Sequence, residues 1–397
     1  MKSIFAVLCC LAFLQPVHSF GQNQQLKELT LEEVIVVAHS NSVEALLAKH
    51  RFTNSYWQFR SYKASYLPSV SMNADLIDFN RSIVKNNVLV DGEWVEQYAP
   101  TNRMNSSMSL QVQQNVPFTG GRIFVNSELG RLDLLNDDPA TMMSTPISVG
   151  FRQPLFAYNE FKWERQIEPL KYAEAKKKYL TSMEDVNLKA SSLFFDMAMT
   201  QMDVRTSTIN VANNDTLYQI ANGRFELGMI DQGDLMQMEL NLLNATDNLT
   251  KNILQLGVKK ARLRTFLGYN DNIDFKLVTS KEVPKIVVDV DRAMEYAREN
   301  NPDMLSMERQ LLEADQSFAR AKADARFNAD LVASYGLTQR ASDLAGVYKN
   351  PQESQRVTVG VSMPLLDWGM RKGQVKMAES SRDVIQLMVQ QQKIDFD

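Results

Sequence analysis

The chain carries few side chains that perform covalent or metal chemistry. It has three histidines and two cysteines, and Cys9 and Cys10 lie next to each other in an apolar run. Because protein zinc sites need about four Cys, His or carboxylate ligands, this set predicts no metal site. No Gly-x-Ser-x-Gly elbow, phosphate-binding loop or His-rich motif is present. We therefore predict no catalytic residue, no cofactor and no enzyme activity.

The charge and hydropathy of the chain exclude two further classes. Lys and Arg number 43 against 47 Asp and Glu, which gives a net charge of −4 and no reason to expect nucleic-acid binding. The mean hydropathy is −0.28, and no run of about 18 apolar residues occurs, so membrane-spanning helices are not predicted.

The N-terminus has the order of a secretory signal peptide. Lys2 is followed by an apolar run, Ile4 to Leu14, and by small residues before Gln22. We predict a signal peptide over residues 1–21; the alternatives are a buried N-terminal helix and a lipid anchor, for which Val7 and Leu8 fit poorly. Cleavage would remove both cysteines, so the exported chain would contain no disulfide.

Helical and alternating patterns predict the elements that carry the remaining polar residues. Thr30 and Glu33 form a capping box, and helical spacing continues to about residue 66. Alternation predicts strands near 70–76, 104–116, 122–131 and 147–154, with a small hairpin at 88–95 on the Asp91–Gly92 turn.

A long helical segment starts near residue 159. Its first half places Met183, Ala190, Met197, Val204 and Val211 seven residues apart, and its second half does the same with Leu235, Leu242, Leu249, Leu256 and Leu263. Such heptads are typical of coiled coils. With a turn at Gly228 to Gly233, they predict an antiparallel hairpin roughly 60 Å or more in length.

The sequence contains an internal repeat. Residues 31–67 align without a gap on 290–326, and 147–156 align on 357–366. We predict a first repeat over 28–268, with strands in 68–153 and a helical hairpin in 157–267, a linker over 269–284, and a second repeat over 285–397. The second repeat is expected to lack about 80 residues of helix, as in a partial sequence or after a premature stop.

Four short segments indicate a family. Pro154-Leu155-Phe156 and Pro364-Leu365-Leu366 each join a strand to a helix, residues 224–235 form a Gly-containing hairpin turn, and residues 117–122 read Pro-Phe-Thr-Gly-Gly-Arg. Together with the export signal and the repeat, they resemble the TolC-like outer membrane efflux proteins, in a Bacteroidetes-like and C-terminally truncated variant. The resemblance covers residues 28 to 397.

The resemblance implies an α+β membrane protein, mostly α, that works as a homotrimer. Each chain would supply amphipathic strands to one barrel in outer-membrane lipid and long helices to a periplasmic tunnel. The chain would be a passive conduit in a tripartite efflux or type I secretion system. A periplasmic adaptor and an inner-membrane pump would be its partners. One chain has too few strands to close a barrel, which independently favours oligomerisation.

The resemblance also names candidate site residues. The hairpin tip would contact the adaptor through Arg224, Phe225, Leu227, Gly228, Met229 and Ile230; the alternative is that these residues only close the hairpin. Asp231 and Asp234 are candidates for an acidic ring across three chains, and helix capping is the simpler role for both. Pro154 and Pro364 are structural junctions. The pattern does not separate drugs, metals or proteins as cargo.

Two alternatives stay open at this stage. The stretches at about 105–116 and 122–131 exceed the two strands per repeat that are typical of the family, so they either widen the barrel or form an appendage. For the function, the alternatives are a soluble periplasmic coiled-coil scaffold or adhesin, and a non-conducting truncated relative of the channels.

Overall fold

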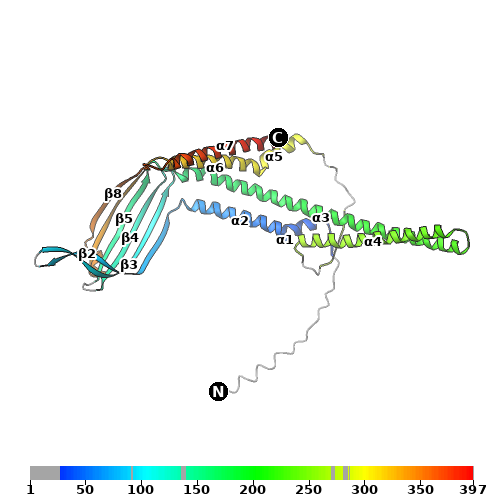
Figure 1. Cartoon of the computed structure of the whole chain (residues 1–397), viewed down its shortest axis with the longest axis horizontal. Coiled ribbons are helices and arrows are strands. Elements are labelled where there is room, and N and C mark those ends of the chain that lie inside the picture. The colour runs from blue at the N-terminus through cyan, green and yellow to red at the C-terminus, as the bar shows by residue number, and fades with distance from the viewer. Residues whose placement is uncertain are drawn as a thin grey trace, which may run out of the picture. The chain divides into compact units, whose positions relative to one another are not determined.

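A computed structural model describes residues 27–90, 93–135, 140–269, 273–279, 285 and 287–396 (Figure 1). The predicted signal peptide and the Asp91–Gly92 turn lie outside the described residues. The chain divides into two compact units. The hairpin unit comprises residues 1–50 and 180–288, and the sheet unit comprises residues 51–179 and 289–397. Helices α2 (Val43–Ala64) and α3 (Glu160–Glu226) each contribute to both units.

The sheet unit is built on one six-stranded antiparallel sheet. Its order is β2-β3-β4-β5-β7-β8, so β2 and β8 form its two edges. The strands are β2 (Ser69–Val90), β3 (Glu93–Val116), β4 (Gly121–Leu134), β5 (Thr141–Pro154), β7 (Asn328–Ala341) and β8 (Gln352–Ser362).

The predicted small hairpin at 88–95 is wrong in its extent. β2 and β3 pair continuously from Ser69 with Gln113 to Val90 with Glu93, apart from one bulge, so 88–95 is the end of a single long hairpin. The sequence pattern predicted two separate elements here, because a polar stretch without alternating side chains lies between them. Backbone hydrogen bonds continue across that stretch and join the two elements into one hairpin. The two additional stretches, 105–116 and 122–131, lie in β3 and β4 of the same sheet.

The sheet has two chemically different faces. The apolar face carries Val70, Met72, Met108, Leu110, Val149, Phe151, Val357 and Val359, and the polar face carries Ser71, Asn73, Ser109, Gln111, Asn126, Ser148 and Ser334. The apolar side chains of Val70 and Met72 are exposed. Alternation of side chains along a pleated strand produces this division.

A β-bulge changes the face of one acidic residue. Asp75 pairs with Ser107 and Asp78 with Asn105, so three residues of β2 span two residues of β3. Residues three apart normally point to opposite faces, but the extra residue places both carboxylates on the polar face.

Helices of the sheet unit pack through aromatic and charged contacts. Phe59 of α2 stacks on Tyr172 of α3 with ring centroids 4.6 Å apart. Arg309 of α6 (Pro302–Asp324) binds Glu174 of α3 at 2.6 Å and Glu313 of its own helix at 2.7 Å. These hydrogen bonds, chiefly the one to Glu174, raise the pKa of Arg309. Helix α7 (Met370–Phe396) packs along α6.

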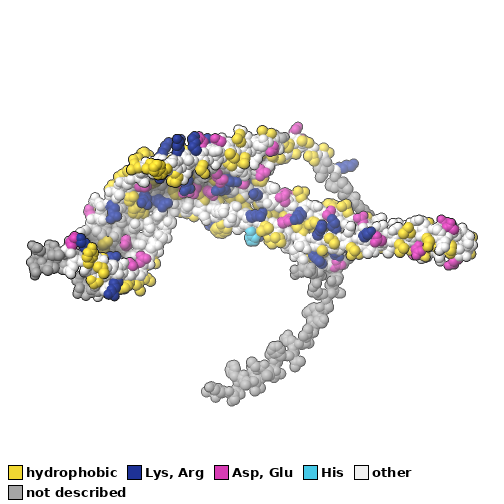
Figure 2. Space-filling view, in the orientation of Figure 1, with side chains coloured by type: hydrophobic (Ala, Val, Ile, Leu, Met, Phe, Trp, Pro, Cys, Tyr) yellow, Lys and Arg dark blue, Asp and Glu magenta, His cyan; other side chains and the backbone are white. Residues whose placement is uncertain are grey.

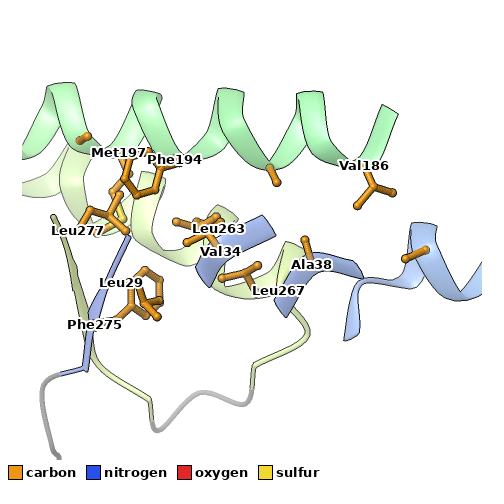
Figure 3. Packing of buried hydrophobic residues seen from close by; sticks show 13 residues of the cluster. Leu29, Val34, Ala38, Val186, Phe194, Met197, Leu263, Leu267, Phe275 and Leu277 are labelled. Carbon is orange, nitrogen blue, oxygen red and sulfur yellow. The ribbon is translucent and has the colours of Figure 1, made fainter. Parts of the chain in front are cut away.

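The hairpin unit has its core where four segments meet. They are α1 (Leu31–Asn41), α3, the end of α4 (Gln232–Phe266) and a two-stranded parallel sheet of β1 (Lys27–Leu29) and β6 (Phe275–Leu277). Figure 3 shows Val34 of α1 among Phe194, Leu263 and Leu267, and all four are buried. β6 lies in the segment predicted as a linker.

The predicted heptads form the seam between α3 and α4. Ala190, Met197 and Leu263 are buried, and the other heptad residues are half-buried. The capping box of Thr30 and Glu33 is also confirmed. Among the described residues, no helix has both the length and the apolarity needed to cross a bilayer.

The same helix break occurs in both predicted repeats. Between α1 and α2, Ser42 has φ −65° and ψ 141°, and its hydroxyl accepts the Ala45 N–H. Between α5 (Val290–Asn300) and α6, Asn301 has φ −66° and ψ 125°, and its side chain accepts the Asp303 N–H. Both breaks are N-caps on an extended residue.

Candidate channel wall and hairpin tip

The tip turn, residues 227–231, closes the hairpin through a Schellman motif. The Met229 N–H donates to the Arg224 carbonyl at 2.8 Å, and the Gly228 N–H donates to the Phe225 carbonyl at 2.9 Å. Gly228 has φ +69°, a conformation that favours glycine. Backbone N–H groups therefore satisfy the Arg224 and Phe225 carbonyls at the end of α3.

The apolar side chains of the tip turn are not used to close it. Leu227 is 73% exposed and Met229 is 69% exposed, whereas Ile230 is half-buried. Phe225 and Arg224 lie in the last turn of α3 and are exposed. Hydrophobic side chains also reach the surface near this turn in Figure 2. Exposed apolar groups on a tight turn are typical of a contact surface.

The two acidic residues of the tip have different positions. The Asp231 carboxylate accepts the Asp234 N–H at 2.9 Å and is the N-cap of α4. Asp234 lies in the first turn of α4 and its side chain is exposed. Capping therefore occupies Asp231, while the Asp234 carboxylate points to solvent.

The strand-to-helix junctions are held by local hydrogen bonds. After Pro154, the Leu155 N–H donates to the Ala329 carbonyl at 2.8 Å, and Asn159 then caps α3 by accepting the Lys162 N–H. After Pro364, the Asp367 carboxylate accepts N–H groups of Gly369 and Arg371, where α7 begins. Both prolines stand where a ladder hydrogen bond is no longer required.

The turn between β3 and β4, residues 117–120, is anchored to the first residues of α3. Asn159 donates to the Pro117 carbonyl at 3.1 Å, and the Arg165 guanidinium lies 5.9 Å from the centre of the Phe118 ring. Gln153 donates to the Thr119 carbonyl at 2.9 Å. The inserted β3–β4 hairpin is therefore fixed at the helix-proximal end of the sheet.

The polar face has a hollow of about 510 Å³ near its other end. Asp75 and Asp78 lie on one side of it and Arg340 on the other. The Ser107 hydroxyl donates to the Asp75 carboxylate at 3.3 Å. The space next to Gly130 is open, because a Cβ there would have no neighbour closer than 3.9 Å. Charged groups of both signs make this surface suitable for hydrated polar solutes.

Sequence reasoning missed a second apolar row on each helix of the hairpin. The exposed residues Leu188, Phe195, Met202 and Ile209 of α3 are seven apart and lie outside the α3–α4 seam. On α4 the exposed residues are Met236, Leu240, Leu243, Leu254 and Val258. The spacing of the α3 row was visible in the sequence, and helices with two apolar rows bind neighbours on two sides.

In the described part of the chain, no group of three or more His, Cys, Asp or Glu residues is arranged to hold a metal ion.

Comparison with known proteins defines the class of fold. Residues 293–395 match the outer membrane efflux protein family. The chain is similar to the Campylobacter jejuni CmeC outer membrane channel, with a TM-score of 0.61 and 14% identity over 92% of this chain and 68% of that one. It is also similar to the Vibrio cholerae outer membrane protein VceC, with a TM-score of 0.60 and 12% identity over 92% of this chain and 75% of that one. For CusC the TM-score is 0.61 and the identity 13%, over 91% of this chain and 71% of that one. No curated protein sequence matches the chain.

These matches confirm the predicted family resemblance and the predicted fold. The chain has the fold of the outer-membrane efflux channels, with long helices and an antiparallel sheet.

Proposed function

We propose that the chain is one subunit of a trimeric outer-membrane channel, the passive exit duct of a tripartite efflux or type I secretion system. The observation that carries this proposal is a six-stranded antiparallel sheet with one exposed apolar face, one polar face and two edges that have no neighbouring strand among the described residues. An apolar exterior and a polar interior are the pattern of an outer-membrane barrel.

The strand count supports closure between copies. Because the order contains an even number of antiparallel strands, β8 of one copy meets β2 of the next in an antiparallel arrangement. A barrel removes the unpaired edges that lipid does not tolerate. The family resemblance sets the number of copies at three, so that six strands per chain give eighteen in the barrel.

The second apolar rows on α3 and α4 support a tunnel made of several copies. Leu188, Phe195 and Met202 cannot be buried by the α3–α4 seam, since they lie on another side of α3. In a ring of helices, each helix contacts one neighbour on each side, and the second row supplies the second contact.

The exposed tip turn supports contact with a periplasmic adaptor. Leu227 and Met229 offer apolar surface, and Gly228 keeps the turn free of a Cβ. Of the two tip acids, only Asp234 has a carboxylate that does not cap the helix, so it is the one whose charge could meet an adaptor.

The first test is conductance of the purified full chain in planar lipid bilayers. We expect discrete current steps.

Two variants of adjacent residues form a matched pair for this test. Met72→Arg puts a charge on the apolar face, and Asn73→Arg puts it on the polar face. Because Arg at the bilayer midplane costs about 2–4 kcal/mol, Met72→Arg should strongly reduce insertion, while Asn73→Arg inserts and alters only the conductance. Absence of current from the unmodified chain, or equal behaviour of both variants, would contradict the proposal.

The adaptor contact has its own test. A photo-crosslinking amino acid at Met229 should capture a periplasmic adaptor in cells, and the same group at Lys251, on the side of α4, should not. Equal capture from both positions would show that the tip has no special role.

A further inference from the structure

Three arginines form a cluster on the polar face, near the helix-proximal end of the sheet. Arg122 of β4 pairs directly with Arg152 of β5. Arg356 of β8 pairs with Ser334 of β7, which in turn pairs with Gly150. We call Arg122, Arg152 and Arg356 the arginine belt.

The register and one side-chain contact show that these arginines share the polar face. A Cβ built on Gly150 would clash with the Phe124 ring, so the Phe124 side chain covers Gly150 on one face. Arg122 is two residues from Phe124, and Arg152 is two residues from Gly150, so alternation places them on that same face. Ile123 and Phe151, the residues between them, lie on the apolar face.

The belt carries uncompensated positive charge. Within the described residues, no ion pair joins any of the three guanidinium groups to a carboxylate, and all three side chains are exposed. The nearest acid on this face is Asp330, which pairs with Gly360 on one side and with Pro154 on the other. Pro154 lies two residues along β5 from Arg152. Like charges directly opposite each other on a sheet are destabilising, so the pair of Arg122 and Arg152 is not retained for stability.

A fourth arginine shows the contrast between the two faces. Arg131 lies on β4, nine residues from Arg122 and therefore on the apolar face. Its guanidinium binds both oxygens of Asp133 at 2.9 Å. The arginine on the apolar face is neutralised within its own strand, whereas those on the polar face present their charge to solvent.

We propose that the arginine belt makes the pore selective for anions, so that carboxylates, phosphates and other negatively charged solutes are its favoured cargo. The inference rests on the proposed channel, in which the polar face lines the pore. Three copies would place nine arginines and three Asp330 carboxylates at one level. A ring with a net positive charge that lines a narrow pore concentrates anions and sets ion selectivity.

The test is the zero-current potential of single channels under a potassium chloride gradient. We expect chloride to be more permeant than potassium in the unmodified protein. The triple variant Arg122→Gln, Arg152→Gln and Arg356→Gln should lower the chloride-to-potassium permeability ratio by about twofold or more. The triple Arg→Lys variant keeps the charge and should retain the ratio. Arg131→Gln, on the same strand but the other face, is the matched control and should leave the ratio unchanged.

The outcomes separate this inference from the proposed function. Current that prefers potassium, or a ratio that the triple Gln variant does not change, would overturn the inference and leave the channel standing. Absence of any current from the unmodified chain would overturn both. If the triple Gln variant fails to insert, Arg122→Gln and Arg152→Gln measured singly should each shift the ratio in the same direction, and no shift from either would overturn the inference.

Discussion

Helices α3 and α4 end in the same backbone motif, but their surroundings are opposite. At the base turn, residues 267–269, Gly268 has φ +68° and the Tyr269 N–H donates to the Arg264 carbonyl, as Met229 does to Arg224 at the tip turn. Leu267 is 0% exposed, whereas Leu227, at the matching position, is 73% exposed.

The difference shows which apolar side chains hold the unit together. Leu267 and Tyr269 belong to the cluster that includes Val34 and Phe275. Leu227 and Met229 contribute no comparable burial within the chain. The backbone closes both turns, so the apolar side chains of the tip remain available to a partner.

The largest expected effect compares the two leucines. Leu267→Ala should destabilise the hairpin unit by about 2–5 kcal/mol, because it leaves a cavity in a filled core. Leu227→Ala should cost less than about 0.5 kcal/mol, since the side chain is already in water. Thermal unfolding followed by helical circular dichroism measures both, and equal melting temperatures would remove the distinction between base and tip.

The two glycines give the next largest effect. Gly268→Ala combines an unfavourable positive φ with a Cβ that would lie 2.9 Å from the Asn41 carbonyl oxygen, and we expect a loss of about 2–3 kcal/mol. Gly228→Ala has only the positive φ, because nothing lies within 4 Å, and should cost about 1 kcal/mol. A larger loss at Gly228 in the same melting experiment would mean that the tip packs against part of the chain.

The two aspartates of the tip come next. Asp231→Ala should cost about 1 kcal/mol, because it removes the N-cap of α4. Asp234→Ala should cost less, and Asp231→Ser, which can still cap, should recover most of the loss. Hydrogen exchange of the first turn of α4 reports this locally; protection unaffected by Asp231→Ala would argue against the cap.

The smallest expected effect is the pH dependence of stability, and it comes from Glu164 in the sheet unit rather than from either turn of the hairpin unit. Burial, and then the nearby Glu160 and Glu168, raise the pKa of Glu164. The native state therefore binds the proton more tightly than the unfolded state, so stability is lost as pH rises from the ordinary pKa through the raised one. Glu164→Gln should stabilise the protein at neutral pH by less than about 1 kcal/mol. The pH dependence of melting should flatten over that range, and a variant that melts lower at neutral pH would refute the assignment.

Sequence patterns predicted the elements that local chemistry determines. The heptad leucines predicted the α3–α4 seam, and Thr30 with Glu33 predicted the start of α1. The alternation of Val70 and Met72 fixed the apolar face of β2.

Features that depend on strand register could not be predicted from the sequence patterns. Arg122 and Arg152 are thirty residues apart and become neighbours only through the pairing of β4 with β5. The bulge that brings Asp75 and Asp78 to one face, and the pairing of β6 with β1, are set by tertiary contacts. The tip residues were located by resemblance, and their role as an adaptor contact stays a prediction.

The most direct test of the central claim is crosslinking between the two edges of the sheet. β2 and β8 lie at opposite edges, so within one chain they are separated by four strands. A chain with Val70→Cys and one of Val357→Cys, Val359→Cys or Val361→Cys is oxidised in the outer membrane. We expect at least one pairing to give a ladder of dimers that ends at trimers, with each single-cysteine variant as control. Monomers alone from every pairing, or a ladder that continues past three copies, would contradict a barrel closed by three chains.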